Sequence, residues 1–283
     1  MADFLSGLEK LGFGNVSDID VYGKEEEVKK ATVQAEEKKK AESTVDESTL
    51  VFEKKMTCPC CNGEFPTLRV RTGKARALKS DSDLRPRCNN FDPVKYDVVS
   101  CPRCGYSAIF SSFDGLVSAQ AKLLRDQVKA KFTGFGEFGN TYSYDEAILR
   151  CKMAILCTVV KRGKDSEKAF SCLKLAWLYR GKAEQLAESG APESVLEQLK
   201  KEEAENLELA YEGFSEAYSK ERFPIIGLPE SGYQYLLAEL ARRIGKIDDS
   251  RRICGRLMQE KDLSRNIKDL IYDLKEKLNE IKE

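Results

Sequence analysis

The hydrophobic and polar positions of the C-terminal part of the chain repeat with the period of an α-helix. From residue 116 onward, apolar side chains recur three and four positions apart, so that each stripe covers one face of a helix. The segment "SYDE" fits a capping box in which Ser143 is the N-cap and Glu146 is the third helical residue. Glycines and prolines separate the stripes. The pattern predicts an all-α domain of roughly six or seven antiparallel helices.

Residues 50–115 have a different pattern, with short β-prone segments interrupted by Pro, Gly and Cys. The stretch "FPTLRVRTGKARAL" alternates around Leu68 and Val70, and "KYDVVSC" and "YSAIFSSF" flank a second pair of cysteines. This segment has too few apolar residues to form an independent core. It is therefore predicted to be a small β-rich domain that needs additional stabilisation.

The first residues divide into two further segments. Residues 1–22 contain an amphipathic turn with Phe4, Leu5, Leu8 and Leu11 on one side. This turn either docks, on the protein's own body or on a partner, or is a frayed terminus. Residues 23–49 contain six lysines, eight acidic residues and no aromatic residue, and are predicted to be a flexible charged linker. The predicted fold is thus α+β and multidomain, with segments 1–22, 23–49, 50–115 and 116–283.

The overall composition excludes several classes of protein. Lysine and arginine total 47, and aspartate and glutamate also total 47, so the chain is neither a globally basic nucleic-acid binder nor a globally acidic one. There is no histidine, which excludes Ser-His-Asp and Cys-His nucleophile pairs, HExxH metal sites and imidazole bases. No other catalytic spacing is evident. We therefore expect a protein that is not an enzyme and has no small-molecule substrate.

The location is predicted from what the sequence lacks. No apolar run approaches the ~20 residues that cross a bilayer. The first residues, "MADFLSGLEKLGF", have no apolar core and carry Asp3 where a secretory signal has a basic residue. We expect a cytoplasmic protein without a membrane partner. In a reducing cytosol, ten cysteines are unsuited to a disulfide framework, which favours metal binding by the paired ones.

Two of the cysteine pairs share the pattern C-P-x-C, followed within two residues by glycine. They are "CPCCNG", with Cys58 and Cys61, and "CPRCGY", with Cys101 and Cys104. A spacing of two residues lets both thiolates of a pair converge on one ion, and four thiolates complete the tetrahedral coordination of Zn²⁺. The sequence predicts one structural zinc ion held by these four cysteines in a zinc ribbon. Such a site needs no histidine.

The remaining cysteines are predicted to have minor roles. Cys60, inside the first pair, is expected to point away from the metal, and Cys88 lies in the loop between the pairs. Cys88 is interpreted as a bystander, although ligand exchange or oxidation sensing stays open. A thiol redox sensor is accordingly an alternative function, and it would require accessible thiols of low pKa. Four further cysteines fall in helical stripes, where small buried residues are expected: Cys151, Cys157, Cys172 and Cys254.

The segment between the cysteine pairs is locally basic. From Lys54 to Cys104 there are eleven basic and five acidic residues. In "RVRTGKARALK" the cations alternate, which would place several of them on one strand face, and such a face can contact phosphates. A nucleic-acid-binding ribbon is therefore a second alternative, beside a solvated hairpin that offsets the charge of the thiolates. The candidate residues are Arg69, Arg71, Lys74, Arg76 and Lys79.

Taken together, several motifs resemble a known family. The stretches "CPCCNGEF", "VRTGKARALKSDSD", "KYDVVSCPRCGYSAIFSSF" and "YQYLLAELARRIG" resemble the uncharacterised bacterial family called domain of unknown function 2225. The resemblance covers most of the chain after Leu50. It implies a zinc-ribbon-like N-terminal part and a helical C-terminal part, without an activity. Members often have glycine directly after the first C-P-x-C, where this chain has Asn62.

The helical part also resembles tetratricopeptide repeats. Small and large residues from Leu237 to Leu257 follow the order of one 34-residue repeat, with Gly245 at the turn between its helices. Stacked repeats present a concave surface to extended ligands. In this alignment Tyr235, Glu239 and Arg242 would face the groove, and nearby arginines would favour an acidic segment or a terminal carboxylate. The leading hypothesis is a non-enzymatic adaptor for a protein or peptide partner; the oligomeric state is left open.

Overall fold

The computed structural model describes residues 5–14, 21–22, 46–74, 77–89, 91–136 and 139–281. Over these ranges the chain forms eight α-helices and two small antiparallel sheets, so it is mostly helical. Phe4, Arg76 and nearly all of the predicted linker lie outside the described residues. Within them, no helix is both long and apolar enough to span a membrane.

The sheets are two hairpins whose tips carry the paired cysteines. Strand β1 (Val51–Thr57) pairs with β2 (Glu64–Val70), and β3 (Val98–Ser100) pairs with β4 (Ser107–Ile109). The second hairpin continues directly into α1 (Phe110–Phe113) and α2 (Ser118–Leu124), followed by a π-helical turn at Arg125–Lys129. The predicted β-rich segment is thus confirmed as strands, but β2 ends at Val70 and does not run on to Lys79.

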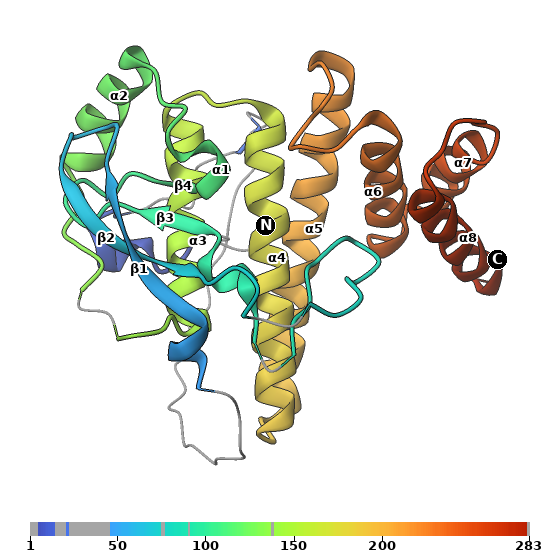
Figure 1. Ribbon diagram of the computed structural model, residues 1–283, viewed down its shortest axis with the longest axis horizontal. Helices are drawn as coiled ribbons and strands as arrows, with labels where there is room; N and C mark the ends of the chain where they lie inside the picture. The colour runs from blue at the N-terminus through green and yellow to red at the C-terminus, as the bar shows by residue number, and fades with distance from the viewer. Residues whose placement is uncertain are drawn as a thin grey trace.

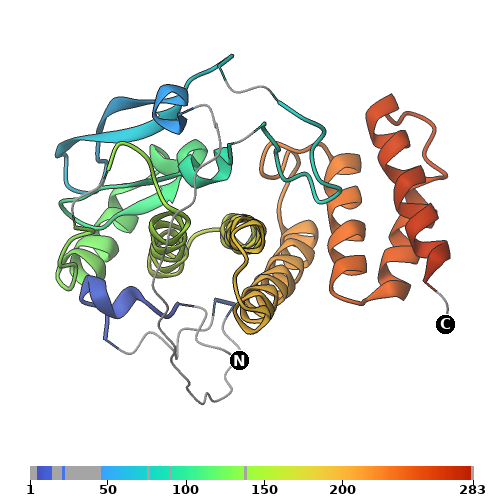
Figure 2. The same cartoon turned by 90° about the horizontal axis from the view of Figure 1, so that it is seen from below.

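The other helices lie side by side in chain order, beginning with α3 against the hairpins and leading away from them (Figures 1 and 2). The predicted capping box is confirmed, because the backbone N–H of Glu146 donates to the Ser143 hydroxyl oxygen and the Glu146 carboxylate accepts from the Ser143 backbone. The array consists of α3 (Tyr144–Val160), α4 (Asp165–Glu188), α5 (Glu193–Lys220), α6 (Glu230–Arg243), α7 (Ile247–Leu257) and α8 (Arg265–Glu280).

One hydrophobic core runs from the hairpins into the helices. Helix α3 lies between them and is buried on most of its faces, because it contacts β3 and β4 as well as α4. The N-terminal segment also joins this core: Leu5, Leu8 and Leu11 are buried, and the Leu11 carbonyl accepts from the Thr133 N–H at 2.9 Å. Of the interpretations of this segment, docking on the protein's own body is the one observed.

The loop between the hairpins crosses the molecule to the far helices (Figures 1 and 2). We call residues 77–89 the crossing loop. Its Asp83 is fully buried and accepts hydrogen bonds from Trp177 Nε1 at 3.1 Å and from Arg180 Nη2 at 2.6 Å, both on α4. Its Ser82 carbonyl accepts from the Tyr235 hydroxyl of α6 at 2.7 Å. The crossing loop thus connects the cysteine hairpins to α4 and α6 through buried polar contacts.

Contacts also cross the predicted domain boundary after residue 115. Asp97, just before β3, pairs with Lys174 of α4 at 2.7 Å. On α3, the Cys157 sulfur accepts from the Ser107 N–H of β4 at 3.4 Å. The boundaries themselves stay a prediction. The hairpins and helices nevertheless share buried surface, which predicts that loss of structure at the hairpin tips is transmitted to α3.

Candidate metal centre

The two cysteine turns have the same backbone geometry. In the first, the Cys58 N–H donates to the Gly63 carbonyl at 3.0 Å and the Asn62 N–H donates to the Cys58 carbonyl at 2.8 Å. In the second, Cys101 and Tyr106 form the equivalent bond at 2.8 Å, and Gly105 donates to the Cys101 carbonyl at 3.0 Å. Both turns therefore present their two cysteines in the same way at the tip of a hairpin.

The residue after the second cysteine of each turn adopts a left-handed conformation. Gly105 has φ +74°, and Asn62 has φ +56°. Glycine enters this region without a steric penalty, and asparagine enters it more readily than most other residues. Asn62 therefore makes the same turn as the glycine that it replaces in the pattern.

The turns bring four sulfur atoms together. The Sγ atoms of Cys58, Cys61, Cys101 and Cys104 all lie within 4.8 Å of one another. The distance is 3.6 Å between Cys58 Sγ and Cys104 Sγ, and 3.7 Å between Cys61 Sγ and Cys101 Sγ. A tetrahedral ion with metal–sulfur bonds of about 2.3 Å requires sulfur atoms ~3.8 Å apart. The four predicted ligands therefore form a cluster that can hold a metal ion.

The cluster is enclosed by protein. Cys58, Cys101 and Cys104 are buried, and Cys61 is partly exposed. Hydrogen bonds from the Cys104 and Cys58 thiols lower the pKa of Cys101, and the same contacts raise the pKa of Cys104 and of Cys58. These three thiols thus influence one another's ionisation. A cation in the centre would bind the four cysteines as thiolates and release their protons.

Packing against the second turn fixes its position. A Cβ atom placed on Gly105 would lie 2.7 Å from Cγ of Phe132 and 3.0 Å from Cε of Met153 on α3. The Cys157 thiol, also on α3, lies 3.6 Å from the Gly105 carbonyl oxygen. Position 105 therefore requires glycine both for its φ angle and for this close approach.

We expect Gly105→Ala to destabilise the metal centre. The positive φ costs ~1 kcal/mol for alanine, and the clash with Phe132 adds ~1–3 kcal/mol, as overpacking does. The matched control is Gly190→Ala, because Gly190 has φ +77° but a Cβ atom added there would meet no described atom within 4 Å. Urea unfolding of both variants measures the difference. Equal destabilisation would contradict a role for packing at Gly105.

The other cysteines lie outside the cluster of four. The Cys60 sulfur is buried 3.8 Å from the Ala121 carbonyl oxygen on α2. Cys88 is partly buried, and burial raises its pKa, which does not favour a redox sensor there. Burial also raises the pKa of Cys157 and Cys172 to about 12. All four cysteines of the helical stripes are buried, as the sequence predicted: Cys151, Cys157, Cys172 and Cys254.

The candidate nucleic-acid residues do not share one strand face. Arg69 lies on β2, with its guanidinium carbon 3.9 Å from the centre of the Phe110 ring. Arg71 follows the strand and donates to the Val51 carbonyl at 2.9 Å. Lys79 reaches α8, where it pairs with Asp273 at 3.3 Å. Lys74 is exposed in the turn after β2, and Arg76 is outside the described residues. Nucleic-acid binding by this set stays a prediction.

The expected partner-binding residues are placed differently from the sequence interpretation. Tyr235 and Glu239 were expected on an open groove, but only 1% and 0% of their surfaces are exposed. The crossing loop covers them: Tyr235 donates to the Ser82 carbonyl, and Glu239 accepts from the Ser82 hydroxyl at 2.7 Å. Arg242 pairs with Glu239 at 2.7 Å. The prediction of an open groove on this side of α6 was wrong, because the crossing loop, whose Ser82 precedes Tyr235 by 153 residues, fills it.

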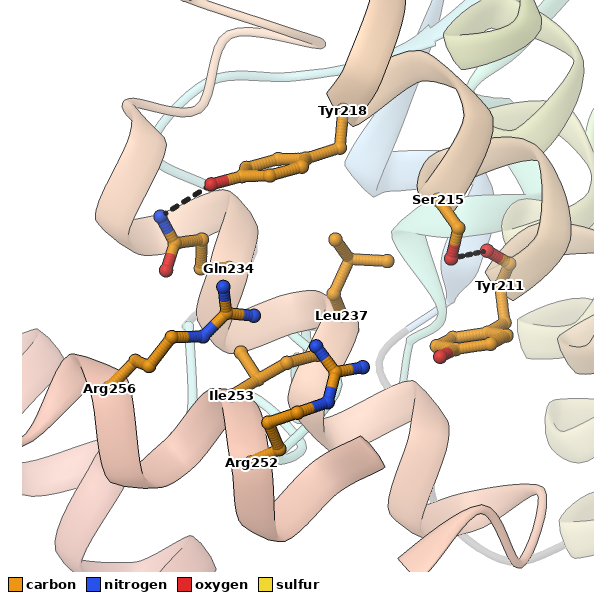
Figure 3. Close-up of a pocket in the computed structure, with 8 residues that line it drawn as sticks. All are labelled: Tyr211, Ser215, Tyr218, Gln234, Leu237, Arg252, Ile253 and Arg256. Carbon is orange, nitrogen blue, oxygen red and sulfur yellow. Dashed lines mark hydrogen bonds between the residues drawn. The ribbon is translucent and has the colours of Figure 1, made fainter. Parts of the chain in front are cut away.

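The structure also contains a pocket that the sequence interpretation did not identify. It lies between α5, α6 and α7 (Figure 3). Tyr211 and Tyr218 of α5 line it. Arg252 and Arg256 line it as well, and these had been noted only as local positive charge. The sequence did not show that these tyrosines and arginines share one pocket, because that depends on which faces of α5, α6 and α7 meet.

Comparison with known proteins gives one family. A family model described as "Uncharacterized protein conserved in bacteria (DUF2225)" matches residues 51–278. The matched range begins at β1, contains all four clustered cysteines and extends into α8. No curated protein and no solved structure matches the chain.

Proposed function

Because the chain belongs to this uncharacterized bacterial family, and because its four clustered thiols lie at the separations that a tetrahedral ion requires, we propose that it is a zinc-stabilised, non-enzymatic adaptor protein. In this proposal one Zn²⁺ joins the two hairpin tips into a zinc ribbon. The helices form a repeat-like scaffold that binds a polypeptide partner. The cluster of four cysteines is the observation that carries the proposal.

The donor set favours zinc in a structural role. Four thiolates fill a tetrahedral site and leave no position for a water molecule or a substrate. The two equivalent turns are each closed by a backbone hydrogen bond, from the Asn62 N–H to the Cys58 carbonyl and from the Gly105 N–H to the Cys101 carbonyl. Iron is the competing ion for four thiolates, and its colour distinguishes it from zinc.

Metal analysis tests the zinc assignment. We expect freshly purified, never-chelated protein to contain one zinc per chain and no visible absorption band. The measurement is inductively coupled plasma mass spectrometry, with an absorption spectrum for iron. The Cys101→Ser variant, purified in parallel, is the control for adventitious zinc. A zinc content far below one equivalent in the parent protein would contradict the zinc assignment. If the protein were coloured and contained iron, iron would replace zinc as the assigned ion.

Repeat-like packing of the helices is supported by the α6–α7 pair. Gly245 has φ +79° at the turn between these helices, as the repeat alignment requires. The Ser250 hydroxyl donates to the Ala238 carbonyl at 2.7 Å, so the two helices approach closely at their small residues. Ala210, Phe214 and Ala217 of α5 are fully buried, which agrees with a second pair formed by α4 and α5. Successive pairs of this kind give an extended surface suited to a polypeptide.

A further inference from the structure

The pocket between α5, α6 and α7 combines an apolar interior with a cationic side. Its volume is about 300 Å³. Leu237 of α6 and Ile253 of α7 form the apolar part, and Tyr211 and Tyr218 of α5 stand on either side of it (Figure 3). This volume is at the lower end of ligand pockets, so it accommodates one large side chain rather than a whole small molecule.

Helix α6 uses opposite faces for the crossing loop and for the pocket. Tyr235 and Glu239, four positions apart, contact the crossing loop. Gln234 and Leu237, three positions apart, line the pocket. The face of α6 that the protein's own loop covers is therefore distinct from the pocket face, and none of the crossing-loop residues lines the pocket.

Two arginines give the α7 side of the pocket its charge. Arg252 and Arg256 are one helical turn apart, and Figure 3 shows both guanidinium groups directed from α7 toward the space beside α5 and α6. Arg252 pairs with Asp249 at 2.5 Å, whereas Arg256 forms no ion pair with any described residue. Lys246 adds a cation 4.8 Å from the centre of the Tyr211 ring. Planar guanidinium groups recognise carboxylates through paired hydrogen bonds.

Gln234 supplies a polar group on the α6 side of the pocket (Figure 3). Its amide nitrogen donates to the Tyr218 hydroxyl at 3.0 Å and to Glu230 at 3.3 Å. No described residue donates to its carbonyl oxygen, which leaves that oxygen as an acceptor for a ligand N–H. A polypeptide has all three complementary groups: a backbone N–H, an apolar side chain and a nearby carboxylate.

We propose that this pocket binds an acidic segment of a partner polypeptide, with one large apolar side chain against Leu237 and Ile253 and an adjacent Asp or Glu held by Arg252 and Arg256. This inference rests on the proposed adaptor function and specifies its ligand. Charge complementarity selects the acidic segment, since the guanidinium of Arg256 lies beside the apolar interior.

The test uses full-length, metal-loaded protein and a displayed pool of decapeptides. Each peptide has capped termini, a central Leu or Phe and random residues elsewhere. We expect enrichment of Asp or Glu next to the apolar residue. A fluorescent copy of the most enriched peptide, measured by anisotropy, should bind at least tenfold more weakly to Arg256→Ala, and more weakly still to the double variant Arg252→Ala with Arg256→Ala.

The matched control is Arg265→Ala, which removes an exposed arginine of α8 that does not line the pocket. It should bind the peptide like the parent protein, and all variants should keep the parent melting temperature. Enriched peptides without acidic residues, or peptides indifferent to Arg256→Ala, would overturn the pocket assignment while leaving the adaptor function intact. A pool with no enriched sequence would count against both. If an uncapped copy of the most enriched peptide bound more tightly than the capped one, a terminal carboxylate would replace the acidic side chain as the group that the arginines hold.

Discussion

Exchanging Cys101 for serine should abolish stoichiometric metal binding and unfold the hairpins. Structural zinc contributes an apparent ~10–16 kcal/mol in small modules, which is as large as the whole stability of a typical domain, ~5–15 kcal/mol. Cys101 is buried between three other thiols, so a serine there leaves the ion with an incomplete set of thiolate donors. Metal content and amide hydrogen exchange measure the outcome.

The pattern of amide hydrogen exchange in Cys101→Ser should follow the packing around the second cysteine turn. Amides of β3, β4 and α3 should lose protection, because α3 contacts the second cysteine turn through Cys157. Amides of α6 and α7 should be least affected, since these helices pack on α5 and α8. The matched control is Cys60→Ser, a buried exchange in the same turn but outside the cluster, and it should keep its metal. Full metal content in Cys101→Ser would refute the four-ligand assignment.

The second large effect is expected from Arg180→Ala. Arg180 contacts the fully buried Asp83 through two nitrogens and also pairs with Glu203 of α5 at 2.7 Å. Its removal leaves a buried carboxylate without its main partner, which costs ~3–5 kcal/mol. The crossing loop should then separate from α4 and α6. Urea unfolding gives the stability, and limited proteolysis within residues 77–89 reports the loop.

The pH dependence of the stability tests the contribution of the Asp83 carboxylate to this loss. Burial by itself raises the pKa of Asp83, but hydrogen bonds and charge from Arg180 outweigh it and the pKa is lowered. In the parent protein this pair adds stability above the usual carboxyl pKa and loses it as the pH falls through the lowered value. Without Arg180 the pKa rises, so the deficit of the variant should be smaller at pH 5 than at pH 7.5.

A surface pair on the same helix provides the control. Lys182 pairs with Asp145, whose side chain is 65% exposed. Exposed pairs contribute ~0–1 kcal/mol, so Lys182→Ala should leave the crossing loop resistant to protease. If Arg180→Ala and Lys182→Ala reduced the stability and the protease resistance of the crossing loop equally little, the buried contacts of Asp83 would not be what holds the loop in place.

The parts of the fold that depend on local pattern were predictable. Two C-P-x-C spacings identified the clustered cysteines, because the turn places each pair without help from the rest of the chain. The capping box at Ser143 and the helical stripes are likewise local, since a period of three and four residues reports which face is buried. The β-prone segment was identified too, although β2 ends earlier than its alternation suggested.

Features that depend on distant partners were not predictable. The segment between the cysteine pairs was interpreted in part as a solvated hairpin, yet its Asp83 and Arg85 are almost completely buried. Their partners are on helices far along the chain, and single-sequence patterns contain no information about such pairing. For the same reason Tyr235 was assigned to an open groove. A stripe of apolar residues shows which face of a helix is buried, but the segment that covers this face is determined by the tertiary structure.

The crossing loop has a consequence for how the protein is made. Both cysteine turns leave the ribosome early, whereas Tyr235 is synthesised 153 residues after Ser82. At ~5–20 residues per second, the loop waits roughly 8 to 30 s for α6. Its ion pairs with α4 can form earlier, because Arg180 is synthesised 97 residues after Asp83, and only the contacts with α6 wait for the full interval. Assembly of the contact between Ser82 and Tyr235 therefore has to follow the synthesis of α6.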